Sequence, residues 1–283
     1  MLNGCAYILT VDVGNTFIRF GLFAEDSAAA QEYPLATCEI TTPPSITADE
    51  ARMRLARVMG ALAADAGMPG VLVPAAAVLS CVVPALERPW KAALSRTCTG
   101  RVLTVGPGLK TGMPVHYDDP AEIGPDRIAD AVAARAVYGS PCIVIDLGTT
   151  TNIEVIDARG TFVGGVIAPG LALGARSLSA AAARLPQVEP SAPTHVIGRN
   201  TREAMRSGVV LGEVARIDGM LDMVLAEMRS TKAAGEGSVP IVITGDDAEA
   251  LAALVGHSLT VDDALTLRGL AELYRINQKP RRA

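Results

Sequence analysis

The stretch LTVDVGNTFIRFGLF at residues 9–23 decides how the rest of the chain is interpreted. Two apolar runs typical of β-strands flank a short polar turn that carries Asp12, Gly14, Asn15 and Thr16. A plain hairpin turn needs only residues that tolerate its backbone conformation, such as Asn and Gly. The additional carboxylate and hydroxyl suggest that this turn also binds a ligand.

A second copy of the pattern occurs in VIDLGTTTNIEVID at residues 144–157, where Asp146 and Gly148 follow another apolar strand. Each copy precedes a third candidate strand, PLATCEI at 34–40 in the first half and TFVGGVIAPG at 161–170 in the second. Two halves with the same order of strands and helices indicate an internal duplication.

Helix and strand patterns alternate through the remainder of the chain. Helices are expected at 47–67, where Thr47 and Glu50 form a capping box, and at 201–228, where Asn200 and Glu203 form another. The expected fold class is therefore α/β, with two duplicated domains that are each a mixed sheet flanked by helices, and with a central cleft between them.

The link GPGLKTGMPVHYDDP is rich in Gly and Pro and separates the two halves. It places the expected boundary near Met113, with domains at 1–113 and 114–283. The first domain then contains the first acidic turn and the second domain contains the other.

The chemistry of both acidic turns favours phosphate. Glycine at a turn reaches positive φ and permits close approach of a ligand, and successive turn amides form an anion-binding nest. A carboxylate beside a polyphosphate requires a cation between them. One copy alone is typical of an ordinary hairpin, but two copies facing each other across a cleft would hold a nucleoside triphosphate and its metal.

Composition narrows the function classes. The 283 residues are 49% hydrophobic and 19% charged with a net charge of −5, which argues against a nucleic-acid-binding protein. The five cysteines form no CxxC pair, so we expect reduced thiols in a cytoplasmic protein. No signal peptide is apparent, and no apolar run reaches the roughly 18 residues of a membrane span.

Two further helix starts are candidates for chemistry. In EIGPDRIADA, favourable interaction with the helix dipole explains Asp126 but not Arg127. The alternative is a carboxylate that accepts a proton beside an arginine that holds an anionic substrate, and the spacing alone does not separate the two. Thr201 begins another helix, where it is either part of a cap or a carboxylate-binding group. The chain has neither a GxxxxGK[ST] nor a GxGxxG motif.

The order of several motifs resembles one known family over nearly the whole chain. DVGNT, SCVVP, GLKTGMPVHYDDPAEIGPDRIADAVAA, IDLGTTT, GGVIAPG, ARLP and IGRNTREAMRSG resemble type III pantothenate kinases. These belong to the actin-like (ribonuclease H-like) superfamily of sugar kinases and heat-shock chaperones. The resemblance implies ATP-dependent phosphorylation of pantothenate to 4'-phosphopantothenate, the first step of coenzyme A biosynthesis. It also implies a cytoplasmic homodimer that uses Mg²⁺ and a monovalent cation, K⁺ or NH₄⁺.

The same resemblance assigns roles to individual residues. Asp126 matches the proton acceptor, Asp12 lies near magnesium, and Asp146 matches the ligand of the monovalent cation. The residues that match ATP contacts are Asp12, Val13, Gly14, Asn15, Thr16, Phe17, Ile18, Arg19 and Thr149. The residues that match pantothenate contacts are Tyr117, Gly124, Pro125, Asp126, Arg127 and Thr201.

The chain departs from the family pattern at three places. Pro125 replaces an alanine, which suits the first turn of a helix. The second phosphate turn has Thr150 where alanine is usual, with Asn152 as its last residue, and Asp246 replaces a glycine near the expected nucleoside site. A carboxylate at 246 either weakens triphosphate binding or caps the following helix. Two alternatives therefore stay open beside the kinase: a non-catalytic nucleotide-binding regulator, and a different phosphotransferase or ATPase of the superfamily.

Overall fold

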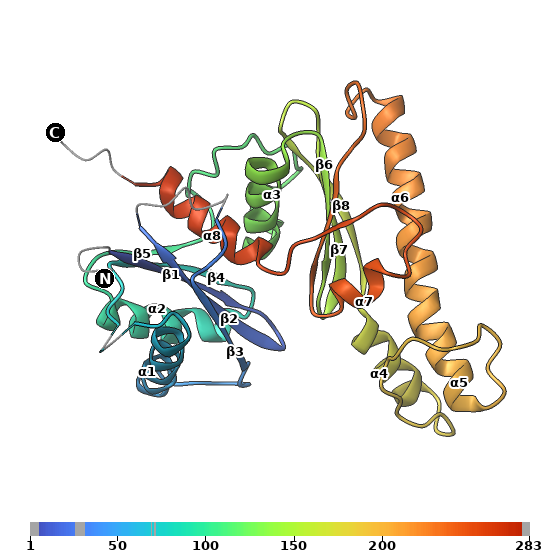
Figure 1. Cartoon of the computed structure of the whole chain (residues 1–283), viewed down its shortest axis with the longest axis horizontal. Helices are drawn as coiled ribbons and strands as arrows, with labels where there is room; N and C mark the ends of the chain where they lie inside the picture. The colour runs from blue at the N-terminus through green and yellow to red at the C-terminus, as the bar shows by residue number, and fades with distance from the viewer. Residues whose placement is uncertain (1–5, 26–31, 69, 71, 279–283) are drawn as a thin grey trace. The chain divides into compact units, whose positions relative to one another are not determined.

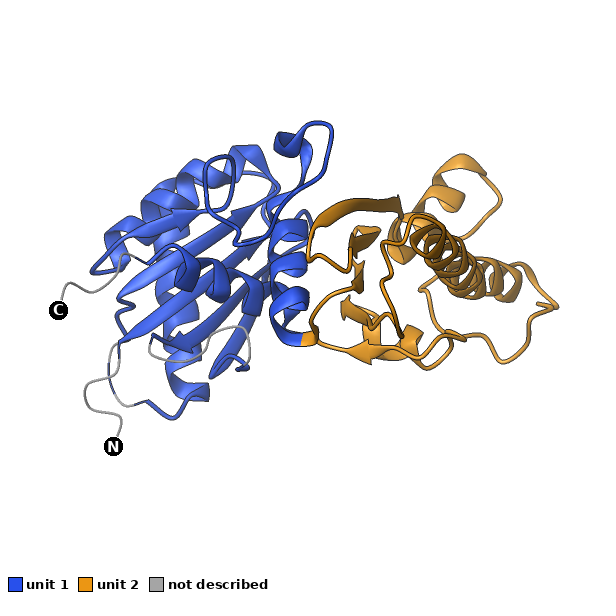
Figure 2. Cartoon of the chain, turned by 90° about the horizontal axis from the view of Figure 1, so that it is seen from above, with its two compact units in different colours: residues 1–137, 264–283 blue, residues 138–263 orange. Residues whose placement is uncertain are grey.

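The computed structural model describes residues 6–25, 32–68, 70 and 72–278. The chain forms two compact units, with residues 1–137 and 264–283 in unit 1 and residues 138–263 in unit 2 (Figure 2). The boundary expected near Met113 falls inside unit 1. The central cleft expected between the halves stays a prediction.

Unit 1 contains a sheet with helices on both faces (Figure 1). Its elements are β1 (Tyr7–Val13), β2 (Phe17–Ala24), β3 (Ala36–Thr41), α1 (Ala48–Asp65), β4 (Ala76–Cys81), α2 (Pro84–Thr97), β5 (Val102–Thr104), η1 (Pro120–Glu122), α3 (Pro125–Tyr138) and α8 (Leu265–Ile276).

The unit 1 sheet has the order β3-β2-β1-β4-β5. The first three strands form an antiparallel meander, whereas β4 and β5 run parallel to β1. Antiparallel neighbours need only tight turns, and parallel ones need the helical crossovers that α1 and α2 supply. The mixed sheet expected from the sequence is confirmed.

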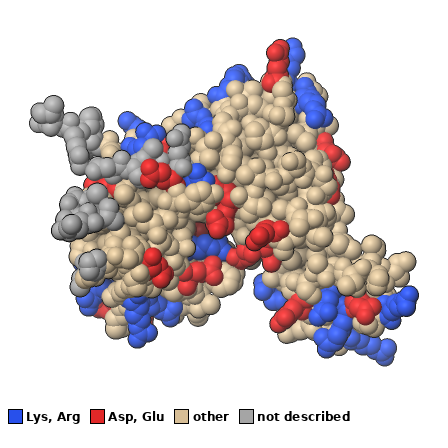
Figure 3. Space-filling view, viewed as in Figure 1, with Lys and Arg blue, Asp and Glu red and all other residues tan. Residues whose placement is uncertain are grey.

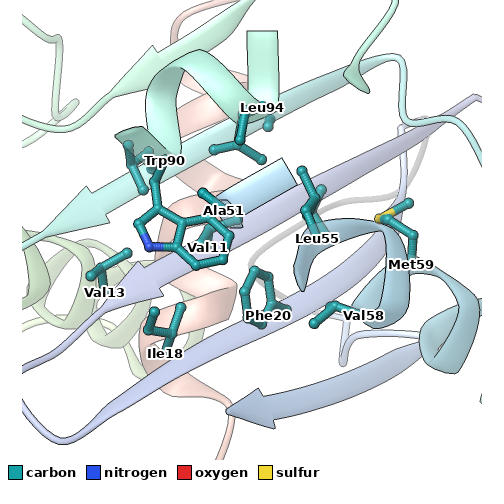
Figure 4. Packing of buried hydrophobic residues seen from close by; sticks show 14 of the residues in the cluster. Val11, Val13, Ile18, Phe20, Ala51, Leu55, Val58, Met59, Trp90 and Leu94 are labelled. Carbon is teal, nitrogen blue, oxygen red and sulfur yellow. The ribbon is translucent and has the colours of Figure 1, made fainter. Parts of the chain in front are cut away.

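Alternate side chains of β1 point to opposite faces of the sheet, one toward the hydrophobic core and the other away from it. Leu9, Val11 and Val13 belong to the core cluster beneath α1 and α2. Val11 and Val13 lie there with Trp90 and Phe20 (Figure 4). The Trp90 and Phe20 rings lie 5.6 Å apart between centroids and are tilted by 59°. Because successive residues of a strand face opposite sides, the other face of β1 carries Thr10 and Asp12.

The sequence signals at the ends of α1 are confirmed. The Thr47 side chain accepts a hydrogen bond from the Glu50 amide at 3.3 Å, and the Glu50 carboxylate accepts one from the Thr47 amide at 2.8 Å. At the other end Gly67 adopts a φ of 65°, which favours glycine.

Helix α8 returns the chain from unit 2 to unit 1. It packs on β1, β2 and β4, on the face of the sheet opposite α1 and α2 (Figure 1). At Gly269 a Cβ would overlap the backbone carbonyl of Ala129 in α3, so the two helices approach each other at backbone distance. This packing is consistent with the inclusion of α3, up to Val137, in unit 1.

Unit 2 repeats the plan of unit 1. Its elements are β6 (Cys142–Leu147), β7 (Thr150–Ile156), β8 (Phe162–Pro169), α4 (Leu171–Ala181), α5 (Thr201–Arg206), η2 (Ser207–Leu211), α6 (Gly212–Ser230), β9 (Ile241–Gly245), α7 (Ala248–Ala252) and β10 (Thr260–Val261).

The strand order β8-β7-β6-β9-β10 matches that of unit 1 strand for strand, as do the antiparallel and parallel pairings. The internal duplication expected from the sequence is confirmed. The helix expected at 201–228 is a continuous helical segment, but it contains a π-helical turn at Ser207–Leu211.

The structure bears on two expectations from the composition, one about the cysteines and one about membrane-spanning helices. Four cysteines are free thiols, namely Cys38, Cys81, Cys98 and Cys142, and Cys5 lies outside the described residues. Across the described ranges, no helix is both long and apolar enough to span a bilayer.

Candidate functional site

The first acidic turn joins β1 to β2 and is tied to the end of β3. The Gly14 amide donates to the Phe17 carbonyl at 3.0 Å, and the Thr42 hydroxyl donates to the Gly14 carbonyl at 2.7 Å. The expectation of a positive φ at Gly14 is wrong. Glycine is favoured for another reason, since a Cβ would lie only 3.0 Å from the Phe17 carbonyl oxygen.

Asp12 is a buried carboxylate at the end of β1, with 7% of the residue exposed. Its neighbours in sheet register are Arg19 on β2 and Ser80 on β4. Among the described residues, Asp12 Oδ1 has no hydrogen-bond partner. Burial and the negative charge of Asp126 raise the pKa of Asp12 to about 6, against the smaller opposing effects of Ser80 and Arg19.

The predicted substrate turn forms the N-terminus of α3. Helix α3 begins at Pro125, and the Ile128 amide donates to the Gly124 carbonyl at 3.1 Å, so the proline occupies the first helical position as expected. The Asp126 Oδ1 accepts a hydrogen bond from the Arg127 amide at 2.8 Å. A Cβ on Gly124 would overlap the same oxygen, so glycine leaves the room that the carboxylate occupies.

The electrostatics of this turn suit a proton acceptor. Burial raises the pKa of Asp126, while the amide and the charge of Arg127 oppose that shift. Arg127 itself is only 5% exposed. The charge of Asp126 raises the pKa of Asp12, so the two carboxylates interact within unit 1, although they are far apart in the sequence. Tyr117 is half-buried in the segment before α3 in the same unit.

The second acidic turn joins β6 to β7 in unit 2. Asp146 is partly buried, and its register neighbours are Asn152 on β7 and Thr244 on β9. The Asn152 side-chain amide donates to Asp146 Oδ2 at 3.4 Å. Asn152, one of the departures from the family pattern, therefore contacts the predicted cation ligand.

The backbone of the second turn is held on both sides. The Gly148 amide donates to the Thr150 carbonyl at 3.0 Å, and the Thr149 carbonyl accepts from the Gly170 amide at 3.1 Å. The expectation of a positive φ at Gly148 is also wrong. In the described part of the chain a Cβ there would meet only the Thr150 carbonyl oxygen, at 3.8 Å, so the missing side chain chiefly leaves the backbone open to a ligand.

Thr201 is exposed at the start of α5 in unit 2. The preceding Asn200 caps the helix, because its side chain accepts from the Glu203 amide at 3.0 Å. The Glu203 carboxylate bonds back to the Arg199 amide at 2.9 Å rather than to that of Asn200, so the expected capping box is displaced by one residue. Since Asn200 supplies the cap, Thr201 is not needed for it.

The departure at Asp246 follows a constrained glycine. Gly245 has a φ of 101°, and a Cβ there would overlap the backbone of Leu147. The Asp246 amide donates to the Leu147 carbonyl at 2.9 Å. The suggestion that Asp246 caps the next helix is wrong, because Asp247 occupies the cap position. Burial and the charge of Asp246 raise the pKa of Asp247, so this strand end is acidic.

Sequence reasoning missed the hydroxyls of Ser80 and Thr244. Each is buried and lies beside a turn aspartate, Asp12 or Asp146, on the neighbouring parallel strand. The only local signal was a hydroxyl near the end of an apolar strand, in VLSC and VITG. Such a signal is weak, because register across a parallel sheet is a long-range property.

The oxygen donors present suit light cations. Groups of three or more His, Cys, Asp or Glu that could hold a metal are absent from the described ranges. Mg²⁺ in nucleotide sites needs fewer protein ligands, since one or two carboxylates share it with phosphates and water. The buried, unpartnered Asp12 Oδ1 therefore fits magnesium. The Asp146 carboxylate fits a monovalent cation as an oxygen donor.

Comparison with known proteins identifies the group to which this chain belongs. The sequence profile of the type III pantothenate kinases matches residues 8–223. The type III pantothenate kinase of Koribacter versatilis is 38% identical over 275 residues, which cover 96% of each chain. Type III pantothenate kinase 2 of Symbiobacterium thermophilum is 39% identical over 274 residues, covering 96% of this chain and 97% of that protein.

A solved structure supports the fold. The ROK hexokinase of Thermus thermophilus superposes with a TM-score of 0.50 at 13% identity, covering 96% of this chain and all of that one. With the duplicated five-stranded sheets, this confirms two actin-like domains. The chain belongs to the type III pantothenate kinase family.

Proposed function

We propose that this protein catalyses the ATP-dependent phosphorylation of pantothenate to 4'-phosphopantothenate, the first step of coenzyme A biosynthesis. Membership of the family supports the reaction. The observation that carries it is the pairing of two acidic groups in unit 1, Asp12 near the end of β1 and Asp126 in the first turn of α3, with the charge of Asp126 raising the pKa of Asp12. One carboxylate suits the cation of a nucleotide and the other suits a reacting hydroxyl.

Asp126 accepts the proton of the pantothenate primary hydroxyl as that oxygen attacks the γ-phosphorus of ATP. The new oxygen–phosphorus bond forms while the bond from the γ-phosphorus to the β–γ bridging oxygen breaks, and ADP leaves. A carboxylate whose pKa is raised by burial is a better proton acceptor near neutral pH than one in water. Arg127, which is buried, would hold the carboxylate of pantothenate through its guanidinium.

The remaining predicted residues divide between the two units. In unit 1 the turn from Asp12 to Arg19 presents amides and side chains to the phosphates, and Tyr117 contacts pantothenate. In unit 2 Thr149 contacts ATP, and Thr201 contacts pantothenate at the start of α5.

Asp12 would hold Mg²⁺ and Asp146 the monovalent cation, K⁺ or NH₄⁺. When bound, these cations neutralise charge on the transferring phosphoryl group. In the chain itself, Arg19 supplies positive charge beside Asp12, and Asn152 orients Asp146 through its side-chain amide.

We further propose a cytoplasmic homodimer with no nucleic-acid or membrane partner. On the face drawn in Figure 3, basic side chains are interspersed with acidic ones. Nucleic-acid-binding proteins instead gather Lys and Arg into a stripe. The net charge of −5 also argues against a nucleic-acid partner.

A coupled assay of ADP release, with and without pantothenate and with K⁺ or NH₄⁺ present, tests the function. Release that depends on pantothenate is the expected result. Release that does not depend on pantothenate would indicate an ATPase. No release despite nucleotide binding would indicate a regulator, the alternative that the acidic strand end at Asp246 favours.

A further inference from the structure

The Ser80 hydroxyl is a polar group of unit 1 for which the proposed reaction provides no role. Ser80 is fully buried on β4, and Oγ has no hydrogen-bond partner in the described part of the chain. A buried hydroxyl without a partner costs about 1–3 kcal/mol. An apolar or small residue would avoid that cost, so the hydroxyl calls for an explanation.

The sheet places this hydroxyl beside Asp12. The two residues are register partners in the parallel pairing of β1 with β4. Their neighbours Val11 and Leu79 point into the core, so Asp12 and Ser80 share the opposite face. Neighbouring strands lie about 4.8 Å apart, so a serine hydroxyl on one strand lies close to a carboxylate directly opposite it on the same face. Asp12 Oδ1 is buried and also lacks a partner among the described residues.

The same arrangement recurs in unit 2. Asp146 has Thr244 of β9 as its register partner, and Thr244 is 2% exposed. Strand β9 occupies the place in its sheet that β4 occupies in unit 1. Both units therefore place a hydroxyl opposite the turn aspartate, from a serine in unit 1 and from a threonine in unit 2.

We propose that Ser80 is a positioning residue whose hydroxyl donates a hydrogen bond to the Asp12 carboxylate and orients it toward the divalent cation of the nucleotide. This inference rests on the proposed function, because it requires a cation-bearing nucleotide at Asp12. Loss of a hydrogen bond to a metal-binding group typically lowers metal affinity 10- to 100-fold.

Binding of Mn²⁺ in the presence of ADP, followed by the electron paramagnetic resonance signal of free Mn²⁺, tests the proposal without turnover. The variants are Ser80→Ala, which removes the hydroxyl, and Ser80→Thr, which restores it. The matched control is Thr104→Val on β5, whose hydroxyl is likewise buried and unpartnered in the described residues. Thr104 is the register partner of Leu79 and so lies on the core face of the sheet, away from Asp12.

We expect Ser80→Ala to raise the Kd of Mn²⁺ about tenfold or more, Ser80→Thr to recover most of the loss, and Thr104→Val to stay within twofold of the wild type. Wild-type affinity in Ser80→Ala overturns the positioning role, as do equal losses in Ser80→Ala and Thr104→Val. If Ser80→Ala does not keep its circular dichroism spectrum, Ser80→Cys replaces it, since a thiol keeps the volume but donates weakly. A wild-type protein that does not bind Mn²⁺ with ADP contradicts the proposed function itself, which separates the two failures.

Discussion

At the scale of single residues, the proposed chemistry depends on how two carboxylates are placed. Asp126 lies at the first turn of α3, where its Oδ1 accepts the Arg127 amide, and burial raises its pKa. Asp12 lies at the end of β1 with a buried oxygen that lacks a partner among the described residues. The surroundings of the two carboxylates differ. Asp126 lies beside a backbone donor and an arginine, whereas Asp12 lies at a buried end of the sheet.

Asp126→Asn should lower kcat by roughly 10²–10⁴-fold, because an amide cannot accept the hydroxyl proton. Stability should not fall, since the substitution removes a partly desolvated charge without changing the side-chain shape. The measurement is pantothenate-dependent ADP release, with thermal unfolding and nucleotide binding as controls for the fold. Turnover within twofold of the wild type would refute the assignment of Asp126 as proton acceptor.

Gly124→Ala should displace the Asp126 carboxylate, because the added Cβ overlaps its Oδ1. Misplacement of a reacting group by about 1 Å can cost up to roughly 10²-fold in rate. The overlapped atom is the end of a side chain, so we expect kcat to fall while the melting temperature changes little. Gly106→Ala is the matched control, since a Cβ there meets nothing within 4 Å. Equal activity in the two variants would contradict the steric argument.

At the scale of elements, α8 packs on the unit 1 sheet and approaches α3 closely. The contact is made between backbones, at Gly269 and Ala129. A side chain at 269 would force apart the helix that begins with the substrate turn and the helix that packs on β1.

Gly269→Ala should therefore destabilise the protein by about 1–3 kcal/mol, the usual range for overpacking. Gly60→Ala in α1 is the matched control, because a Cβ at Gly60 meets nothing within 4 Å and the position is exposed. In that case the helix propensity of alanine should stabilise the protein by about 0.5–1 kcal/mol. Chemical denaturation of both variants measures the two changes, and the same sign in both would argue against close packing at 269.

At the scale of the whole molecule, Asp12 links stability to pH. Its pKa is about 6 in the folded protein, against 3.8 for an unperturbed aspartate. As pH rises, the unfolded chain loses this proton first, so the folded state loses stability between about pH 4 and pH 6. Above that range the cost is constant, on the order of 2–3 kcal/mol at 1.36 kcal/mol for each pKa unit.

Asp12→Asn removes this cost. We expect the variant to match the wild type in stability near pH 4 and to exceed it increasingly up to about pH 7, in the absence of nucleotide. Urea unfolding across this pH range is the measurement. A difference that stays flat with pH, or that shrinks as pH rises, would show that Asp12 is not a desolvated carboxylate in the folded protein.

Much of the fold was readable from local patterns. The repeated D-x-G-x-T turns predicted the duplication, and the Thr47 capping box and Gly67 predicted the ends of α1. The two acidic turns and the start of α3 were identified as candidate sites on the same grounds. These signals lie within a few residues of one another, so the sequence contains both partners of each interaction.

Other features required the folded chain. The division into units after α3, the return of α8 to unit 1, and the hydroxyls of Ser80 and Thr244 beside the turn aspartates arise between residues far apart in the sequence. The backbone of Gly14 also differs from expectation, because the geometry of its turn is set by hydrogen bonds to Phe17 and Thr42. The sequence by itself determined the strands, the cap of α1 and the acidic turns, since these depend on local hydrogen bonding and on the period of apolar residues. Only the tertiary structure decided which side chains share a site, because sheet register and helix packing are set by contacts that no local pattern specifies.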